Sequence, residues 1–203
     1  ADVRLASADY TARSQDAATV FTHPAGMTRL DGDQLVLSGQ MLYGSVGFDP
    51  ASGTTPALGT GDGGNPIEWL PGGGRFYSRS ISPDVQIAIA VTGNFGSVVE
   101  YDSGWVGRYR AQESTLIGYS ILPSVAWRVN DKFSVGASLN AMYGTFENTV
   151  AVNNIIGPDG SLKLDDTDWA LGANLGLLYE TSPTTRFGLT YTSPVDLDFR
   201  SAA

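Results

Sequence analysis

The sequence contains no cysteine and a single histidine, and only 16% of its residues are charged. Without cysteine, the chain forms no disulfide and has no thiolate for catalysis or metal binding. It also contains no run of about 18 apolar residues, the length that a membrane-spanning helix requires. Its formal charge of -9, from 12 basic and 21 acidic residues, argues against nucleic-acid binding, which requires a basic surface.

Apolar residues instead alternate with small or polar residues in several segments. From Phe133 to Tyr143 every odd position is apolar, and the even positions carry serine, glycine, asparagine or methionine. Alternation with a period of two predicts a β-strand with one apolar face. The same pattern occurs in further segments, near residues 35–43, 75–81, 85–91, 117–129, 169–179 and 187–191. We therefore predict an all-β, antiparallel protein with about seven strands in this chain.

The segments 115–129, 132–147 and 167–180 are much longer than the roughly 5–6 residues of an ordinary strand. An apolar band about 25 Å tall, crossed at about 45° with a rise near 3.3 Å per residue, requires roughly 11 residues. Short turns follow Ser82, Val129 and Glu180, whereas the other connections, 48–72, 97–113 and 149–165, are long. Short turns on one side and long loops on the other are typical of a transmembrane β-barrel.

Aromatic residues flank the short turns. Trp127 and Phe133 bracket one turn, and Tyr179 and Phe187 bracket another. On outward-facing positions these four side chains would lie at one depth, as an interfacial aromatic girdle does. The alternative is cross-strand aromatic pairing in a soluble β-sandwich.

Residues 1–34 do not alternate. A stretch of helical character precedes a Pro-Ala-Gly turn at residues 24–26. A compact segment of this kind before the first strand predicts a plug inside a wide barrel.

Two blocks of sequence resemble a known family. The segment 16–27 carries an Asp-Ala pair followed by His-Pro-Ala-Gly, which is similar to the N-terminal hatch signature, Asp-Ala then Asn-Pro-Ala-Gly, of FadL-type outer-membrane transporters. The segment 175–199 resembles that family's strand, short turn and strand ending in Tyr-x-Ser-x-Val-x-(Leu/Ile)-Asp-Phe, and residues 123–143 also fit.

The resemblance implies a 14-stranded transmembrane β-barrel, with an N-terminal hatch over residues 1–34 and strands 1–7 over residues 35–203. It implies passive uptake of hydrophobic compounds, either long-chain fatty acids or aromatic hydrocarbons, across the outer membrane of a Gram-negative bacterium. The partners would be the hydrophobic small molecule and lipid or detergent. The hatch motif would consist of His23, Pro24, Ala25 and Gly26.

The family releases its substrate sideways, through a gap made by an inward kink in the third strand. Here we place the third strand at 84–95, where two glycines surround an aromatic residue and permit a bend. The residues of the lateral opening would be Gly93, Asn94, Phe95 and Gly96. The alternative is an ordinary strand end at a glycine-rich turn.

The chain departs from the family at two positions. His23 replaces the family's asparagine, and a lone histidine is usually a hydrogen-bonded structural residue rather than a ligand or base. The carboxylate-binding arginine of the fatty-acid carriers would fall near Val150, where this chain has none. A neutral hydrophobic compound is therefore an alternative to a fatty acid as the substrate.

Seven strands leave two unpaired edges, which lipid does not tolerate. We therefore expect the remaining half of the barrel to come from the same gene or from another chain. A gene ending at Ala203 whose product purifies as a monomeric closed barrel would contradict this expectation.

The sequence predicts neither an enzyme nor a metal or cofactor site. The acidic residues at 165, 166, 168, 196 and 198 permit calcium binding or acid–base chemistry, but loop acids are usually solvated. The glycines at 72–74 lack the Lys-Ser/Thr that a phosphate-binding loop requires. The alternative function is that of a non-transport β protein, such as a surface adhesin or a carbohydrate-binding β-sandwich.

Overall fold

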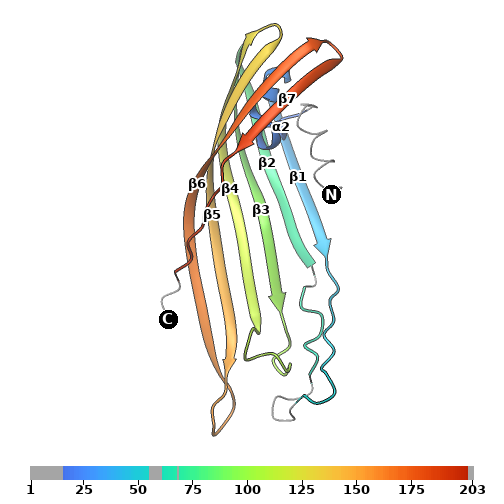
Figure 1. Ribbon diagram of the computed structural model, residues 1–203, viewed down its shortest axis with the longest axis vertical. Helices are drawn as coiled ribbons and strands as arrows, with labels where there is room; N and C mark the ends of the chain where they lie inside the picture. Colours follow the sequence, from blue (N-terminus) through green and yellow to red (C-terminus); the bar gives the residue numbers. More distant parts are fainter. Residues whose placement is uncertain (1–15, 55–60, 68, 201–203) are drawn as a thin grey trace.

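The computed structural model describes residues 16–54, 61–67 and 69–200. Within them, one antiparallel sheet follows the order of the sequence and curls into a half-barrel (Figure 1). Its strands are β1 (Gln34–Tyr43), β2 (Trp69–Ser82), β3 (Val85–Glu100), β4 (Glu113–Asn130), β5 (Phe133–Val152), β6 (Gly160–Ser182) and β7 (Thr185–Thr192). The all-β prediction is confirmed, and a single curled sheet is not a β-sandwich. None of the helices in these residues is long and apolar enough to cross a membrane.

The two faces of the sheet differ as the alternation predicts. On β4, Ser120, Leu122 and Ala126 face the concave side and are at most 1% exposed. Tyr119 and Trp127, at the alternate positions on either side of this set, face outward and are 49% and 51% exposed. An outward face rich in large apolar side chains is unfavourable in water and suits lipid.

The three predicted short turns are present, at residues 83–84, 131–132 and 183–184. Two of them begin one and two residues later than predicted, because β4 continues to Asn130 and β6 to Ser182. Each is stabilised by the last residue of the preceding strand, whose side-chain oxygen accepts hydrogen bonds from backbone N–H groups of the turn. Asn130 Oδ1 accepts from Lys132 and Phe133, Ser82 Oγ from Asp84 and Val85, and Ser182 Oγ from Thr184 and Thr185. We call this the short-turn end; it lies at the top of Figure 1, opposite the long-loop end.

Two of the long loops are shorter than predicted, because the flanking strands continue. The β3–β4 and β5–β6 connections comprise residues 101–112 and 153–159, not 97–113 and 149–165. Beyond the predicted membrane both faces of a strand contact water, so the apolar alternation ends while backbone pairing continues. The β1–β2 connection likewise ends before residue 69, since 69–72 belong to β2.

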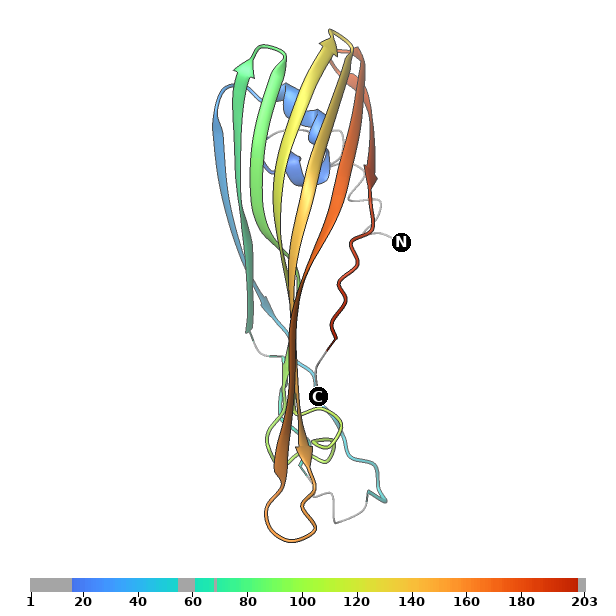
Figure 2. The same cartoon turned by 90° about the vertical axis from the view of Figure 1, so that its left-hand side faces the viewer.

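A short helical segment, residues 16–30, lies inside the curl near the short-turn end (Figure 2). We call it the inner segment; it contains α2 (Thr19–Thr22) and the 3-10 helix η1 (Pro24–Arg29). Its apolar side chains form the main core with the concave face of β2–β4, so the curl of the sheet is filled at this level. The residues of that core are Ala17, Val20, Met27, Leu30, Phe76, Ala88, Ala90, Leu122 and Ala126.

The chain leaves the sheet after Thr192, so residues 193–200, predicted to belong to the strand region, are not a strand. They lie against β5 and β6 instead. A Cβ on Gly172 would meet Val195, and one on Gly144 would meet Leu197 and Phe199. Glycines in the wall therefore give this stretch its space.

Candidate functional site

The inner segment is tied to five strands by polar contacts. The Nδ1 of His23 shares a hydrogen bond of 2.7 Å with Thr190 Oγ1 on β7. Thr28 Oγ1 donates to Ser134 Oγ on β5 at 3.0 Å, and Gln86 Nε2 on β3 donates to the Leu30 carbonyl at 2.7 Å. Arg29 forms an ion pair with Glu180 on β6, and Arg128 on β4 donates to the Thr28 carbonyl. Because these contacts reach β3–β7, they hold the segment across most of the curl.

The predicted hatch motif lies directly on two glycines of the wall. His23, Pro24, Ala25 and Gly26 are all buried. Gly136 and Gly176 are paired neighbours on β5 and β6. A Cβ added to Gly136 would lie 2.3 Å from the Ala25 backbone nitrogen, and one on Gly176 would lie 2.9 Å from the same atom. The two glycines therefore create the depression that the motif occupies, a role that the sequence analysis missed.

His23 is fully buried, and its Nε2 has no hydrogen-bond partner among the residues that the structure describes. Burial lowers the pKa of its imidazole to about 4. The ring is therefore neutral at neutral pH. Its hydrogen bond with Thr190 helps to hold the inner segment against β7.

The predicted lateral opening lies inside β3 rather than at its end. β3 continues to Glu100, so both the predicted strand limit at residue 95 and the alternative of an ordinary strand end are wrong. The register with β4 shifts between Gly93 and Phe95, which leaves Asn94 as a bulge. Asn94 Nδ2 donates to Ser120 Oγ at 2.6 Å, which anchors the bulge to the concave face. A bulge of this kind bends a strand and increases its twist.

At the same level the wall between β2 and β3 separates. Their pairing runs from the short turn only as far as Gly74 and Thr92. Beyond that point residues 69–73 of β2 pair with β1 alone, and residues 93–100 of β3 pair with β4 alone. Figure 1 shows the two strands diverging towards the long-loop end.

A cavity of about 760 Å³ occupies this separation. Its lining includes outward-facing side chains, such as Val91 and Tyr119, and inward-facing ones, such as Gln40 on β1 and Leu70 on β2. Residues from both faces of the wall therefore line the cavity. Gly93, Asn94, Phe95 and Gly96, the residues predicted for the opening, all contribute to its lining.

Two of the glycines that line this cavity, Gly93 and Gly96, have room for a side chain. The nearest atom to a Cβ on Gly93 would be the Gly73 carbonyl oxygen at 4.0 Å. A Cβ on Gly96 would make ordinary contact with Leu70 Cδ2 at 3.5 Å. Leu70 is therefore the side chain that reaches across from β2, and side chains at positions 93 and 96 would project into the opening without a clash at Cβ.

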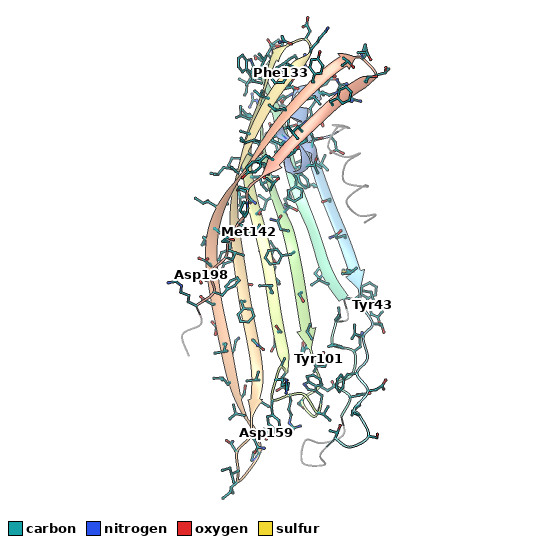
Figure 3. All side chains as sticks on the ribbon, in the orientation of Figure 1. Tyr43, Tyr101, Phe133, Met142, Asp159 and Asp198 are labelled. Atoms are coloured by element: carbon teal, nitrogen blue, oxygen red, sulfur yellow. The ribbon has the colours of Figure 1, made fainter. Side chains whose placement is uncertain are left out.

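The four girdle residues cluster on the outward face near the short-turn end. Phe133, Tyr179 and Phe187 are direct cross-strand neighbours on β5, β6 and β7, and Trp127 on β4 pairs with Val135, two residues along β5 from Phe133. Figure 3 labels Phe133 at this end of the molecule. Trp127, Tyr179 and Phe187 are 51%, 45% and 63% exposed on this face, and their assignment to an interfacial girdle stays a prediction.

A second aromatic row, which the sequence analysis missed, runs across the outward face nearer the long-loop end. Tyr119, Tyr143 and Trp169 are cross-strand neighbours on β4, β5 and β6, and the rings of Tyr143 and Trp169 are 5.0 Å apart. From 133 to 143 on β5 is ten residues, which at about 45° of tilt spans roughly 23 Å. The two rows therefore bracket a band of membrane height. The signal was present in the alternating segments themselves.

The loops at the long-loop end pack against each other around the β3–β4 connection. Trp105 stacks on Tyr101 at 3.8 Å and meets the edge of Phe48 at 5.6 Å, which joins this loop to the β1–β2 loop. Arg108 Nε and the Tyr109 hydroxyl both donate to Asp159 in the β5–β6 loop, at 2.7 and 2.8 Å. These hydrogen bonds hold the pKa of Asp159 below its usual range. Figure 3 labels Tyr101 and Asp159 among these loops.

Among the acidic residues considered for calcium, Asp166, Asp168 and Asp198 accept hydrogen bonds from protein groups. Asp168 accepts a hydrogen bond from the Asp198 backbone N–H at 2.7 Å, and Asp198 pairs with Arg200. Residues 16–54, 61–67 and 69–200 contain no group of three or more candidate metal ligands.

Comparison with known proteins gives consistent results. The model of a family described as "Outer membrane protein transport protein (OMPP1/FadL/TodX)" matches residues 3–203. The chain is 28% identical to the long-chain fatty acid transport protein of Salmonella typhi over 210 residues, which cover 92% of this chain and 46% of that protein.

Among solved structures, a FadL homologue from Pseudomonas aeruginosa superposes with a TM-score of 0.66 at 19% identity, covering 93% of this chain and 51% of the homologue. The toluene transporter TbuX of Ralstonia pickettii superposes with a TM-score of 0.64 at 17% identity, covering 92% of this chain and 55% of that structure. The chain thus spans about half the length of the relatives that it matches.

Proposed function

Because this chain belongs to the outer membrane protein transport protein (OMPP1/FadL/TodX) family, a family of transport channels rather than enzymes, we propose that it forms the part of an outer-membrane channel through which a hydrophobic compound leaves sideways into the bilayer. The chain is accordingly an outer-membrane component with a transmembrane β fold. The lateral path and the nature of the compound are the content of the proposal.

The observation that carries the proposal is the cavity through the wall between β2 and β3. An apolar molecule transferred from water into lipid gains about 0.8 kcal/mol for each buried CH₂ group. A lateral opening lets a hydrophobe move from the lumen into the membrane without crossing periplasmic water. Net movement of the hydrophobe into the membrane is then driven by its partition from water into lipid and needs no other energy input.

The inner segment supports a lateral rather than an axial path. It fills the curl between the opening and the short turns, and it is tied to β3–β7. We propose that it is the hatch, and that its described part, residues 16–30, blocks a straight path to the short-turn end. Residues 1–15, also assigned to the hatch from sequence, lie outside the described residues.

The free edges of the sheet indicate what completes the barrel. In an antiparallel sheet of seven strands in sequence order, β1 and β7 run in the same direction. A second copy of this sheet placed edge to edge around a common axis would therefore meet it in parallel orientation. We propose that the completing segment instead begins and ends with strands of the opposite direction, whether it belongs to the same gene or to another chain.

The compound belongs to one of the two classes named for relatives. One relative is named as a long-chain fatty acid transport protein and one neighbour as a toluene transporter. Both classes are hydrophobic, and a cavity of about 760 Å³ accommodates either.

Replacing both Gly93 and Gly96 with valine tests the lateral path. Because a Cβ at either position extends into the opening without a backbone clash, the barrel should assemble while uptake of a radiolabelled fatty acid and of toluene falls. Gly39→Val on β1 is the control, because a Cβ there meets nothing within 4 Å and Gly39 lines only the small adjoining recess, not the larger cavity. Assembly is read from faster migration of the unboiled protein on a detergent gel. Full uptake by a correctly assembled double variant would exclude this path.

A further inference from the structure

Arg75 is the one charged residue among those lining the opening between β2 and β3. It occupies an outward position on β2 and is exposed. Its cross-strand neighbours are Leu37 on β1 and Val91 on β3, and both face outward with 68% and 43% of their surfaces exposed. Arg75 therefore lies at the membrane-facing mouth of the opening, between apolar side chains.

The depth of Arg75 makes its charge unusual. The row that contains it continues through Val91 on β3 to Ile121 on β4. On β4 this row is two residues from Tyr119, on the side of the aromatic row that faces the middle of the band. An arginine on the lipid-facing side of a membrane strand is unfavourable unless it has a partner or reaches the interface.

The described residues supply no acidic partner for Arg75. The acid on the same part of the sheet, Asp33, lies near the other end of β2, where it is 3.9 Å from Arg79 and accepts a hydrogen bond from the Tyr77 hydroxyl at 3.3 Å. No ion pair or hydrogen bond within the part of the chain that the structure describes involves the Arg75 guanidinium. An anionic ligand that passes through the opening could therefore pair with the Arg75 guanidinium.

Polar groups continue from Arg75 through the wall. Ser38 and Gln40 on β1 and Thr92 on β3 line the same cavity from the concave side, and they also line an adjoining recess of about 180 Å³. Leu42, Leu70, Val91 and Phe95 supply apolar surface beside them. The opening thus presents a polar track ending at a cation, next to an apolar wall, which matches a molecule with an anionic head and a hydrocarbon tail.

We propose that Arg75 binds the carboxylate of a hydrophobic substrate at the membrane-facing mouth, and that it makes the opening selective for anionic amphiphiles over neutral hydrocarbons. The inference rests on the proposed lateral channel and names a specificity-determining residue for it. It also places the anion contact far from the position near Val150 at which the family's arginine was expected. Guanidinium binds carboxylate through two parallel N–H···O contacts, which a neutral substrate cannot make.

The test compares two substrates with equal tails, hexadecanoate and its methyl ester, in cells whose own hydrophobe channels are deleted. In Arg75→Gln we expect uptake of the acid to fall about tenfold, the scale of one charge-assisted hydrogen bond, with uptake of the ester unchanged. Arg75→Lys should retain most acid uptake. Arg79→Gln is the matched control, because Arg79 is an exposed arginine on the same face of β2 that does not line the cavity.

The outcomes separate the inference from the channel itself. If Arg75→Gln leaves acid uptake unchanged, or reduces acid and ester equally in a correctly assembled barrel, the selectivity role is wrong and the channel stands. If the wild type imports the ester but not the acid, the selectivity role is likewise wrong and the channel stands. If the wild type imports neither compound, the proposed channel fails and the inference with it.

Discussion

Glycines in the β5–β6 part of the wall and glycines in the β2–β3 part have opposite surroundings. Gly136 and Gly176 face the inner segment so closely that an added Cβ would lie 2.3 and 2.9 Å from the Ala25 nitrogen. Gly93 and Gly96 lie on β3 of the same sheet, and a Cβ added there would have no atom nearer than 4.0 and 3.5 Å. The first pair makes room for the inner segment, and the second pair borders the cavity between β2 and β3.

The backbone pairing differs in the same way. β5 and β6 pair without a break from Phe133 and Tyr179 to Val152 and Gly160. β2 and β3 stop pairing at Gly74 and Thr92, and a bulge at Asn94 follows. The inner segment thus packs on a continuous ladder, whereas the ladder beside the cavity, where we propose the lateral exit, is interrupted. The role of a glycine in this wall is therefore decided by what lies opposite it.

Gly136→Val should have the largest effect, because it places side-chain atoms where the Ala25 backbone lies. Overpacking of this kind costs about 1–3 kcal/mol. We expect the inner segment to be displaced, which is measured as faster cleavage by an added protease within residues 16–30 and a lower urea midpoint in lipid vesicles. Gly39→Val, with no neighbour within 4 Å of its Cβ, is the control. Equal protection of the segment in both variants would contradict the close contact.

A smaller loss of folding stability is expected on acidification, because His23 in the inner segment is buried as neutral imidazole. Since burial lowers the pKa of the folded-state imidazole from 6.5 to about 4, the neutral ring is favoured on folding. The stability that this contributes is present above pH 6.5 and is lost as the pH falls from 6.5 towards 4. Urea unfolding across this range should show the slope in the wild type.

His23→Asn supplies the comparison for that measurement, because asparagine has no titrating group. We expect the variant to lose the slope between pH 6.5 and 4 while the remaining carboxylate titrations stay. An identical pH profile in the two proteins would show that the histidine is not buried as neutral imidazole.

The smallest effect is expected from spin labels, which should report the depth of the wall without changing its stability. The chain has no cysteine, so single labels can be placed on β6 at Trp169, Leu175 and Tyr179. If the two aromatic rows mark opposite interfaces, a label at 175 should be the most accessible to oxygen. A steady trend from 169 to 179 would show that the rows do not bracket the bilayer.

Much of the fold could be predicted, because alternation is a local property. The outward faces of β3–β7 and the three short turns follow from apolar spacing and from Asn, Ser and Pro at the turns. The ends of β5 and β6 were placed wrongly because polar residues such as Asp165 and Asp166 pair in strands beyond the apolar band. No apolar face is required there, so the pattern carries no signal.

The candidate site was predicted only in part. The residues 93–96 were named for the opening, and they line the cavity, but the partner strand β2 and its Arg75 were not. Likewise His23 to Gly26 were named, whereas Gly136 and Gly176 beneath them were not. Each missed residue acts through a neighbour that is distant in sequence, such as Ala25 for Gly136, and spacing along one strand does not report it.

The sequence by itself determined which face of each strand contacts lipid, since side chains alternate across a strand and the apolar set must share one side. It also determined where the chain turns, through residues that satisfy turn backbone with their own side chains. Only the tertiary structure decided which neighbouring strands pair along their whole length and which separate. Pairing depends on the register between segments that are distant in sequence and on what packs against them, so the end of β2–β3 pairing at Gly74 and Thr92 and the bulge at Asn94 became visible only in the folded sheet.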